Sequence, residues 1–571
     1  MTEANYWTRL QRRQLTRRRL LQRSGFAAAG LGAYATVGCG DDDDDDDDDD
    51  DQGAPGATGT EGASGEQPSD SGSPQRGGTL TQIQEDDLPD LNHVNQVTSS
   101  LHGSLGSVAN GVIQHSPTGE IVPDLASEWE QPEPNTYIFT FHEGVTWHDG
   151  EPFSPEDVKA TFEYILSDPS PARLHSRKID YLANVDPAGI TVPDERTLSM
   201  VLSQPRGSFL DSIAVGWMTI GPAGILTSDP AFLDTNAVGT GAFMLDSYTP
   251  GSSVTLVRNP NYFLPDEPYV DELTTLLTVD QATALTTFEA RRAVMSGIRA
   301  PLDVNLAEQL ESRTDMVVEY KIQFGHAVFY PNHQREPFSD PRVRRAMNIA
   351  IDRQQALEVL NGGQGEVAAF ISPGPFEYPR DELAQVPGYR EDKEADRQEA
   401  RQLLEAAGFA DGLEVSIMQR APSPQWEAWS IFMQDQWQQI GLNVSIQPTE
   451  QESFNLRRNE LDFDVYVGAG TSRELGDPFF AAAQIGPAND FGFDDQEALQ
   501  LFEAQVGEAD EEARRQLVRQ LEDRLFEIAA YFPLFHETAP FAWYPEVRNY
   551  VAPEGSPFAG VRQLSRVWLA G

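Results

Sequence analysis

The sequence predicts an α/β protein of more than one domain. Stretches in which every second residue is apolar indicate strands, as in Tyr137, Phe139 and Phe141. Stretches with apolar residues three or four positions apart indicate helices, as in Val158 and Phe162. The two patterns are interleaved from about residue 77 onward, which favours an α/β class. The chain has 571 residues. A single hydrophobic core rarely supports more than about 250–300 residues, so we expect several domains.

The chain begins with a segment typical of an export signal. Residues 1–38 hold seven arginines and one acid, followed by a short apolar stretch at 25–37. That stretch is too short to span a bilayer, which takes about 20 apolar residues. A basic segment followed by a short apolar one is typical of a signal peptide. The segment Thr16–Leu21 (TRRRLL) resembles a twin-arginine export motif. We therefore expect a signal peptide over 1–38.

Cys39, the single cysteine, stands where the apolar stretch ends. The segment Thr36–Cys39 (TVGC) resembles a lipobox, in which the cysteine is lipidated and becomes the mature N-terminus. The alternative is that Cys39 is an incidental small apolar residue. The sequence favours lipidation, because the single cysteine stands just where the apolar stretch ends, as a lipidated cysteine would.

Residues 39–76 are predicted to form a disordered tether. Eleven consecutive aspartates occupy 41–51, and self-repulsion keeps such a block extended. Residues 52–76 are rich in Gly, Ser and Pro and have little to bury. A lipid on Cys39 and this tether would hold a folded body away from a membrane. No later stretch is long and apolar enough to span a bilayer, so we expect a soluble body.

The folded body is predicted to open with a strand at 77–83, followed by a strand at 137–141. Ser154 suits the N-cap of the next helix, Pro155 suits its first turn, and Asp157 stands at the capping-box position. Patterning then predicts a strand at 254–257, helices at about 339–351, 395–407 and 429–440, strands at 442–446 and 463–467, and a last helix at 511–530.

Composition and missing motifs exclude several functions. The formal net charge of −49 argues against a nucleic-acid partner. One cysteine excludes an internal disulfide and any multi-cysteine metal site. No lysine follows a glycine, so there is no P-loop, and neither Gly-x-Ser-x-Gly nor His-Glu-x-x-His occurs. His142, His148 and Asp149 lie close together, but we favour a polar loop over a metal or acid–base site. We therefore predict no catalytic residues, no cofactor and no metal.

The negative charge is unevenly distributed. Residues 1–38 carry a net +6, and residues 41–75 carry −14, which leaves −41 for residues 76–571. The body contains four lysines, and its other cations are arginines. We expect a strongly hydrated, salt-tolerant surface and hypothesise a saline or high-GC source.

Several segments, in the same order, resemble the extracytoplasmic solute-binding proteins of ABC importers, in family 5, which carries oligopeptides, dipeptides and nickel chelates. The densest is 121–165, which contains Pro-Asp-Leu-Ala, an aromatic strand and Gly-Val-x-Trp-His-Asp-Gly. The others are 239–243 (GTGAF), 258–262 (RNPNY), 337–353 (PFSDPRVRRAMNIAIDR) and 400–412 (ARQLLEAAGFADG). The resemblance extends over nearly all of residues 77–571.

The resemblance implies a two-lobed periplasmic-binding-protein-like fold with a hinge and an extra subdomain in the first lobe. Lobe 1 would comprise 77–324 and 538–571, with the subdomain at 121–238, and lobe 2 would comprise 325–537. The implied function is to capture a small ligand, a peptide or peptide-like molecule, and to deliver it to a membrane permease driven by a separate ATPase. The protein would be a monomeric lipoprotein facing the periplasm or cell exterior, and not an enzyme.

The resemblance also suggests where the ligand binds. Thr471, Ser472, Arg473 and Asp477 follow the strand at 463–467, in a region where peptide-binding members place a carboxylate for the ligand's α-amino group. Gly476-Asp477-Pro478 matches, but Ser472 or Arg473 stands where an earlier aspartate is expected. Arg473 would favour an anionic ligand, unless it pairs with an acid of its own loop.

Further ligand-binding candidates are spread along the chain. They are Trp426 and Trp217, in or beside predicted loops, Asp87 and Asn92 after the first strand, and Asn332 before the Pro337 segment. For each, a place in the core or in a solvated loop is the alternative. Two other functions stay open: the same fold binding a sugar oligomer, opine or metal chelate, and a secreted hydrolase with a carboxylate site.

Overall fold

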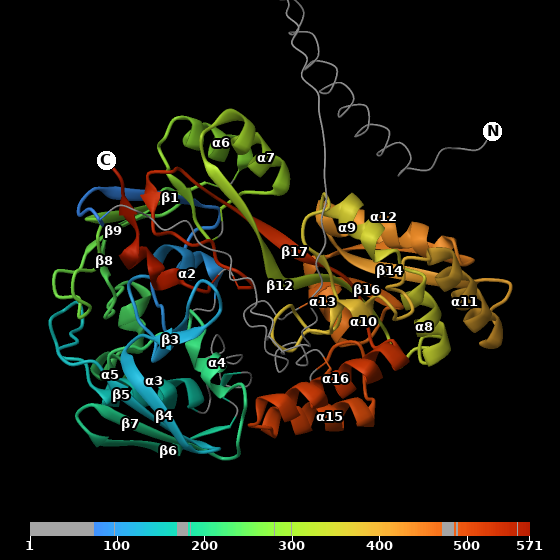
Figure 1. The fold of residues 1–571 in the computed structure, drawn as a ribbon, viewed down its shortest axis with the longest axis horizontal. Coiled ribbons are helices and arrows are strands. Elements are labelled where there is room, and N and C mark those ends of the chain that lie inside the picture. The colour runs from blue at the N-terminus through green and yellow to red at the C-terminus, as the bar shows by residue number, and fades with distance from the viewer. Residues whose placement is uncertain are drawn as a thin grey trace, which may run out of the picture. The chain divides into compact units, whose positions relative to one another are not determined.

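The computed structural model describes residues 73–571 apart from 96–97, 168–180, 183, 279, 299, 471–484, 487–488 and 557. In this part helices and strands are interleaved (Figure 1), so the predicted α/β class is confirmed. The predicted signal peptide and residues 39–72 of the predicted tether, including Cys39, lie outside the described residues, whereas Arg76 at the end of the tether forms an ion pair with Asp266 at 2.9 Å.

The largest sheet of the described part has eleven strands, in the order β15-β14-β16-β12-β17-β11-β1-β10-β9-β8, with β13 paired to β17. We call the part around β14, β15 and β16 the second lobe, and the part around β1 and β8–β11 the first lobe. The strands are β1 (Thr79–Gln84), β8 (Phe243–Thr249), β9 (Ser253–Arg258), β10 (Glu272–Leu277), β11 (Met295–Ser296), β12 (Val317–Pro331), β13 (Glu366–Val367), β14 (Leu413–Ala421), β15 (Leu442–Glu450), β16 (Val465–Gly470) and β17 (Phe532–Trp543).

A separate antiparallel sheet in the first lobe has the order β4-β5-β7-β6, formed by β4 (Ala126–Glu133), β5 (Thr136–Phe141), β7 (Thr197–Leu202) and β6 (Val185–Asp194). Phe139 and Phe141 of β5 are buried with Phe162 of α3 (Pro155–Leu166) in a core of their own. This layer is the extra subdomain of the predicted fold class. Two small pairs complete the described sheets: β2 (Ile113–His115) with β3 (Ile121–Pro123), and β18 (Val547–Arg548) with β19 (Trp568–Leu569).

Helices surround both lobes. The first lobe has α2 (Ser99–Leu105), α4 (Phe209–Ala214), α5 (Ala223–Ser228), α6 (Gln281–Glu289), α7 (Val304–Arg313) and the 3-10 helices η3 (Pro230–Asp234) and η4 (Val561–Arg566). The second lobe has α8 (Pro341–Ile349), α9 (Arg353–Leu360), α10 (Arg380–Leu383), α11 (Lys393–Ala406), α12 (Pro424–Gln438), α13 (Gln451–Asn459), α15 (Gln496–Gly507) and α16 (Glu511–Ile528).

The N-terminus of α3 has the predicted capping box. Ser154 caps the helix, Pro155 fills the first turn, and the Asp157 carboxylate accepts a 2.8 Å hydrogen bond from the Ser154 backbone N–H. Asp157 also accepts from the backbone N–H of Ala223 at 2.8 Å, which ties α3 to the start of α5. Burial raises the pKa of this carboxyl, and these hydrogen bonds work against the rise.

The predicted helices and strands are present, but their bounds differ from those expected, and three of them serve as examples. The helix expected at 339–351 is α8, which spans Pro341–Ile349. A separate helix follows it, because the side chain of Asp352 accepts from the Gln355 backbone N–H at 2.9 Å and caps α9. The strand expected at 463–467 is β16, which begins at Val465 and continues to Gly470. The helix expected at 511–530 ends at Ile528, where Ala529 adopts a left-handed conformation with φ of 47°.

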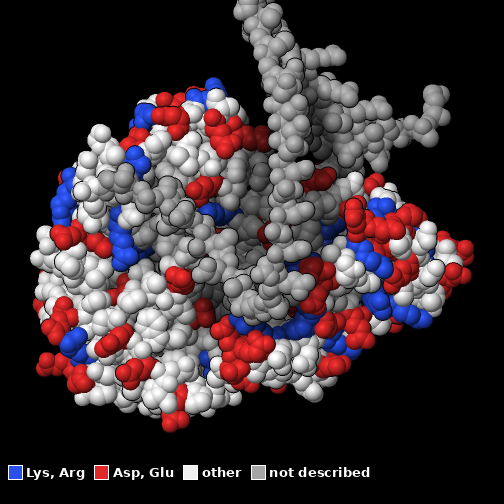
Figure 2. All heavy atoms as spheres, in the orientation of Figure 1, with Lys and Arg blue, Asp and Glu red and all other residues white. Residues whose placement is uncertain are grey.

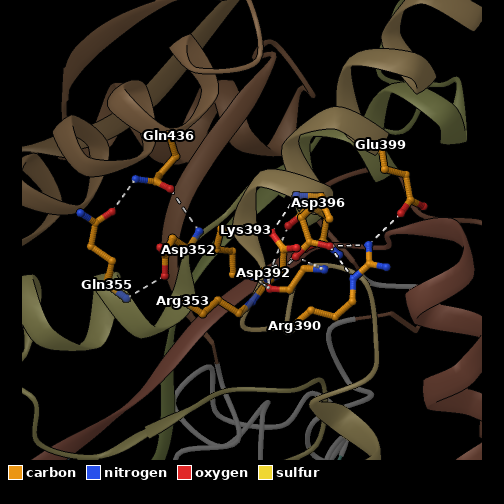
Figure 3. Close-up of polar contacts among 12 residues, drawn as sticks. Asp352, Arg353, Gln355, Arg390, Asp392, Lys393, Asp396, Glu399 and Gln436 are labelled. Carbon is orange, nitrogen blue, oxygen red and sulfur yellow. Dashed lines mark hydrogen bonds and ion pairs between the residues drawn. The ribbon is translucent and has the colours of Figure 1, made fainter.

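A buried polar cluster joins the helices of the second lobe (Figure 3). Asp396 of α11 is fully buried and lies 2.5 Å from Arg390 and 3.1 Å from Lys393. Arg353 of α9 is also buried, and it donates to the carbonyls of Pro533 in β17 and Gly388 at 2.8 and 2.9 Å. These contacts fix α9 and α11 against the strand that leads to the first lobe.

Candidate functional site

Two long strands connect the lobes. In the first lobe, residues Val317–Ile322 of β12 pair with Thr538–Trp543 of β17. In the second lobe, residues 326–331 of β12 pair with β16, and β17 continues beside them. The β12–β17 register is irregular between Ile322 and His326, and again between His326 and Val328. We call residues 322–326 and 536–538 the crossing; in Figure 1 it lies where the two strands pass between the lobes.

A segment from the end of the chain pairs with the irregular part of β12. The backbone N–H of Phe324 donates to the carbonyl of Gly555 at 2.7 Å, and Gly555 N–H donates to Ile322 at 2.8 Å. Gly555 has φ of +74°, and a Cβ there would lie 2.2 Å from Cζ of Phe324. From the second lobe, the Ser372 hydroxyl donates to the Phe324 carbonyl at 3.2 Å. Phe324 therefore contacts both lobes at the crossing.

A cavity of about 600 Å³ lies beside the crossing, and we call it the crossing pocket. Small-molecule ligands occupy cavities of roughly 300–1,000 Å³. One wall comes from β2, α4 and residues 554–559 of the first lobe, and another from residues 366–380 of the second lobe. Ile322 and Phe324 of β12 line it as well. The pocket thus lies where both lobes meet the strands that join them.

Within the part of the chain that the structure describes, the crossing pocket is lined by four carboxylates and one guanidinium, from Asp211, Glu366, Glu377, Glu554 and Arg380. Arg380 forms an ion pair with Glu366, lies 3.5 Å from Glu377, and donates to a backbone carbonyl at 2.9 Å. On the opposite wall, Nε2 of the buried His115 lies 3.3 Å from Asp211. The carboxylate of Glu554 is exposed and has no partner among the described residues. The lining therefore carries an excess of negative charge.

Two histidines are buried at the crossing. His326 and His536 are register partners on β12 and β17, and their ring centroids are 5.5 Å apart. Burial lowers the pKa of His326 to about 4 and holds that of His536 well below its usual value. Both imidazoles are therefore neutral at physiological pH and pack at the crossing as uncharged groups.

The most specific predicted residues, Thr471, Ser472, Arg473 and Asp477, lie outside the described residues, as does Cys39. The residue before them, Gly470, ends β16 and pairs with His326 at the crossing. Thr471 is thus the next residue in the sequence after the crossing end of β16. Ligand-binding loops of α/β proteins follow strand ends in this way.

Trp426 lies at the start of α12, near the crossing. Its ring is half-buried, with the guanidinium of Arg420 centred 4.5 Å above it and the ring of Phe454 5.7 Å away. The adjacent Gln425 donates to Glu537, in the crossing part of β17, at 2.6 Å.

Trp217 is 4% exposed and belongs to the core of the extra subdomain. Its ring centroid lies 4.7 Å from that of Phe558, beside the pocket-lining segment 554–559. The indole Nε1 is buried and has no hydrogen-bond partner among the described residues. A buried indole N–H usually finds a partner.

Asp87, Asn92 and Asn332 are each occupied by contacts that stabilise the fold. Asp87 accepts from the Tyr248 hydroxyl at 2.8 Å and from a backbone N–H, and Asn92 donates to Asp234 at 2.8 Å. Asn332 donates to the carbonyls of residues 461 and 463, just before β16. It therefore lies at the other end of β16 from Gly470.

The pocket-lining residues Phe324, Phe376, Arg380 and Glu554 were not anticipated from the sequence. The strand that contains Phe324 has a usable signal, because Val318, Tyr320 and Ile322 alternate with polar residues. Arg380 begins the four-residue helix α10, and Phe376 and Glu554 belong to irregular segments, so none of the three has a pattern that would single it out.

No helix of the described residues is long and apolar enough to cross a membrane. Across the same residues, no three His, Cys, Asp or Glu side chains gather in an arrangement suited to a metal ion.

Comparison with known proteins finds related sequences over most of the chain. The profile of the bacterial extracellular solute-binding proteins, family 5, matches residues 120–492, more than half of the chain. The chain is 25% identical to heme-binding protein A of Haemophilus influenzae over 496 residues, which cover 81% of this chain and 86% of that protein. It is 24% identical to the dipeptide-binding protein of Escherichia coli K12 over 462 residues, which cover 76% and 84%.

A solved structure has a similar fold. The periplasmic binding protein DppA of Helicobacter pylori, in complex with the peptide STSA, matches with a TM-score of 0.70 at 20% identity. The match covers 87% of this chain and 99% of that chain. Two lobes are the architecture of these periplasmic binding proteins, so the predicted two-lobed fold is confirmed.

Proposed function

Because the chain belongs to family 5 of the bacterial extracellular solute-binding proteins of ABC importers, we propose that it is a lipid-anchored receptor that encloses a peptide or peptide-like ligand between its lobes. The observation that carries the proposal is the crossing pocket, which has walls from both lobes and from β12. A ligand in such a pocket has more contacts when the lobes are closed, and this difference in affinity favours the closed state.

The proposed lobes are residues 77–324 with 538–571, and residues 325–537, with 121–238 as the extra subdomain. The two boundaries between the proposed lobes, 324/325 and 537/538, fall at the crossing, where the β12–β17 register is irregular. Rotation about two strands is a hinge motion, which a few residues with adjustable backbone absorb. Small-angle scattering tests this step: saturating ligand should reduce the radius of gyration, and an unchanged radius would argue against closure.

The proposed ligand-binding residues are Thr471, Ser472, Arg473 and Asp477, which follow β16 directly, together with Trp426 and Trp217. The support for Trp217 is its buried Nε1, which has no partner among the described residues. Asp87, Asn92 and Asn332 have lower priority, since their side chains already bond within the fold. Trp217→Phe keeps an aromatic ring beside Phe558 and removes the N–H, so weaker ligand binding at unchanged stability would support a direct role.

Ligand identity is tested by thermal-shift screening of the purified chain against peptide, sugar-oligomer, opine and metal-chelate libraries. Stabilisation by peptides supports the proposal. If only another class of ligand stabilises the protein, the conclusion is instead a receptor of the same fold for that class. The relative named as heme-binding is a reason to include non-peptide ligands. The remaining alternative, a secreted hydrolase, would convert its ligand into products. If such turnover is measured and a single Asp or Glu substitution abolishes it, the receptor proposal is replaced by the hydrolase.

The lipid anchor and delivery to a permease are further parts of the proposal. The lipobox-like segment ending at Cys39 and the acidic tether after it support membrane attachment. Replacing Cys39 with serine should move the protein from the membrane fraction to the soluble fraction. Unchanged fractionation would contradict the anchor without affecting ligand binding.

A further inference from the structure

We propose that the crossing pocket selects ligands with a positively charged side chain, so that the peptides it takes are basic ones. The inference rests on the proposed function, because it assigns a ligand class to the same pocket. Three features of the pocket carry it: the balance of its charges, the occupied state of its guanidinium, and an aromatic ring beside its carboxylates.

The charge balance is the first feature. Among the described side chains that line the pocket, Asp211, Glu366, Glu377 and Glu554 are acidic, and Arg380 is the one permanent cation. A cavity with low-dielectric walls and charge of one sign concentrates ligands of the opposite sign. Residues 76–571 carry a net −41, so the field of the whole body acts in the same direction as the lining.

The pairing of Arg380 is the second feature. Its guanidinium contacts the carboxylates of Glu366 and Glu377 and the carbonyl of Val367, all in its own lobe. An anionic ligand would have to displace these contacts. The cation therefore neutralises part of its own wall and does not serve as a binding group for a carboxylate or phosphate.

The opposite wall is the third feature. Asp211 has one partner, His115 at 3.3 Å, and the Glu554 carboxylate has none among the described residues. The ring of Phe324 lines the same cavity, against Gly555, the neighbour of Glu554. Carboxylates supply charge-assisted hydrogen bonds to a guanidinium or ammonium group, and an aromatic face attracts the same cations. Asp211 and Glu554 are thus placed to pair with a basic side chain.

The test compares three tripeptides of equal length, Ala-Arg-Ala, Ala-Gln-Ala and Ala-Glu-Ala, by calorimetric titration into the purified full chain. We expect Ala-Arg-Ala to bind at least ten-fold more tightly than Ala-Glu-Ala at low ionic strength, with Ala-Gln-Ala between them. The Glu554→Gln variant should lower this ratio several-fold, and Asp211→Asn with Glu554→Gln should remove most of it.

The matched control is Glu308→Gln, which neutralises an exposed carboxylate of α7 outside the pocket and should leave the ratio unchanged. Glu554 has no partner to lose, so its variant should keep the wild-type melting temperature. Equal binding of all three peptides would overturn the charge selectivity and leave the peptide receptor intact. A preference that both pocket variants retain would overturn the assignment to this pocket. Failure of every peptide to bind would overturn the proposed function itself.

Discussion

Gly555 shows how strongly one backbone position constrains the crossing. It has a positive φ, and its Cα faces the ring of Phe324 so closely that a Cβ would lie 2.2 Å from the ring. Side chains other than glycine are strained at such a φ whatever the space. Because the two backbones lie this close, both the N–H and the carbonyl of Gly555 form hydrogen bonds with the irregular part of β12.

We predict that Gly555→Ala lowers the free energy of unfolding by about 1–3 kcal/mol, because the methyl group displaces the Phe324 ring. Thermal or urea denaturation followed by circular dichroism measures the change. The control is Gly224→Ala in α5, where no atom lies within 4 Å and φ is not positive. That variant should be neutral or slightly stabilising. Equal melting temperatures for wild type and Gly555→Ala would show that the ring moves aside at no cost.

Glu522 of α16 is a buried acid that the proposed function does not use. It is 1% exposed and accepts a 3.2 Å hydrogen bond from the backbone N–H of Ile371. Burial raises the pKa of its carboxyl to about 8, from an ordinary value of 4.5. Between these two pH values the folded protein keeps a proton that the unfolded chain has lost. This group therefore makes stability fall as pH rises from 4.5 to 8.

We predict that Glu522→Gln raises stability at pH 8 by on the order of 3 kcal/mol and leaves it nearly unchanged at pH 4.5. The amide has the shape of the protonated acid and stays neutral throughout, so the pH-dependent loss disappears. Urea denaturation at a series of pH values measures the effect. Glu527→Gln, an exposed position on the same helix, is the control. A gain that is equal at both pH values would contradict a raised pKa.

At the scale of elements, local signals were predictable and long-range pairings were not. Ser154, Pro155 and Asp157 lie within four residues of one another, so the start of α3 could be predicted from capping chemistry alone. The crossing could not, since β12 and β17 are more than 200 residues apart and no local pattern pairs them. The crossing pocket was missed for the same reason, because its walls come from five separate segments of the chain.

We predict that Asp396→Asn lowers the free energy of unfolding by about 3 kcal/mol, because the variant removes a fully buried carboxylate from its ion pairs with the partly buried Lys393 and Arg390. Asp396 is fully buried between Arg390 and Lys393, and the cluster holds α11 against the rest of the second lobe. Chemical denaturation measures the loss. Glu399→Gln is the matched control: it removes the other acid beside Arg390, but that side chain is 35% exposed, so the cost should stay below about 1 kcal/mol. Equal costs for the two would argue against the importance of burial.

At the scale of the whole molecule, the dominant feature is self-repulsion. Acidic side chains are spread over both lobes on the face shown in Figure 2, with basic ones in smaller groups. We predict that raising NaCl from 0.05 to 1 M increases the melting temperature, because the screening length falls to about 3 Å at 1 M. Sucrose of equal osmolality is the control for excluded-solute effects. A melting temperature that falls with salt would mean that attractive ion pairs outweigh the repulsion.

β17 has a further consequence for how the chain reaches its native state. It lies between β12 and β11, and it is the one link in the strand order between the sheet of the first lobe and that of the second. Its residues, 532–543, are synthesised more than 200 residues after those of β12. Until they emerge, β12 and β11 have exposed edges and the large sheet is in two pieces. Pairings this distant in sequence slow folding, so the newly made chain must be protected from aggregation until β17 is available.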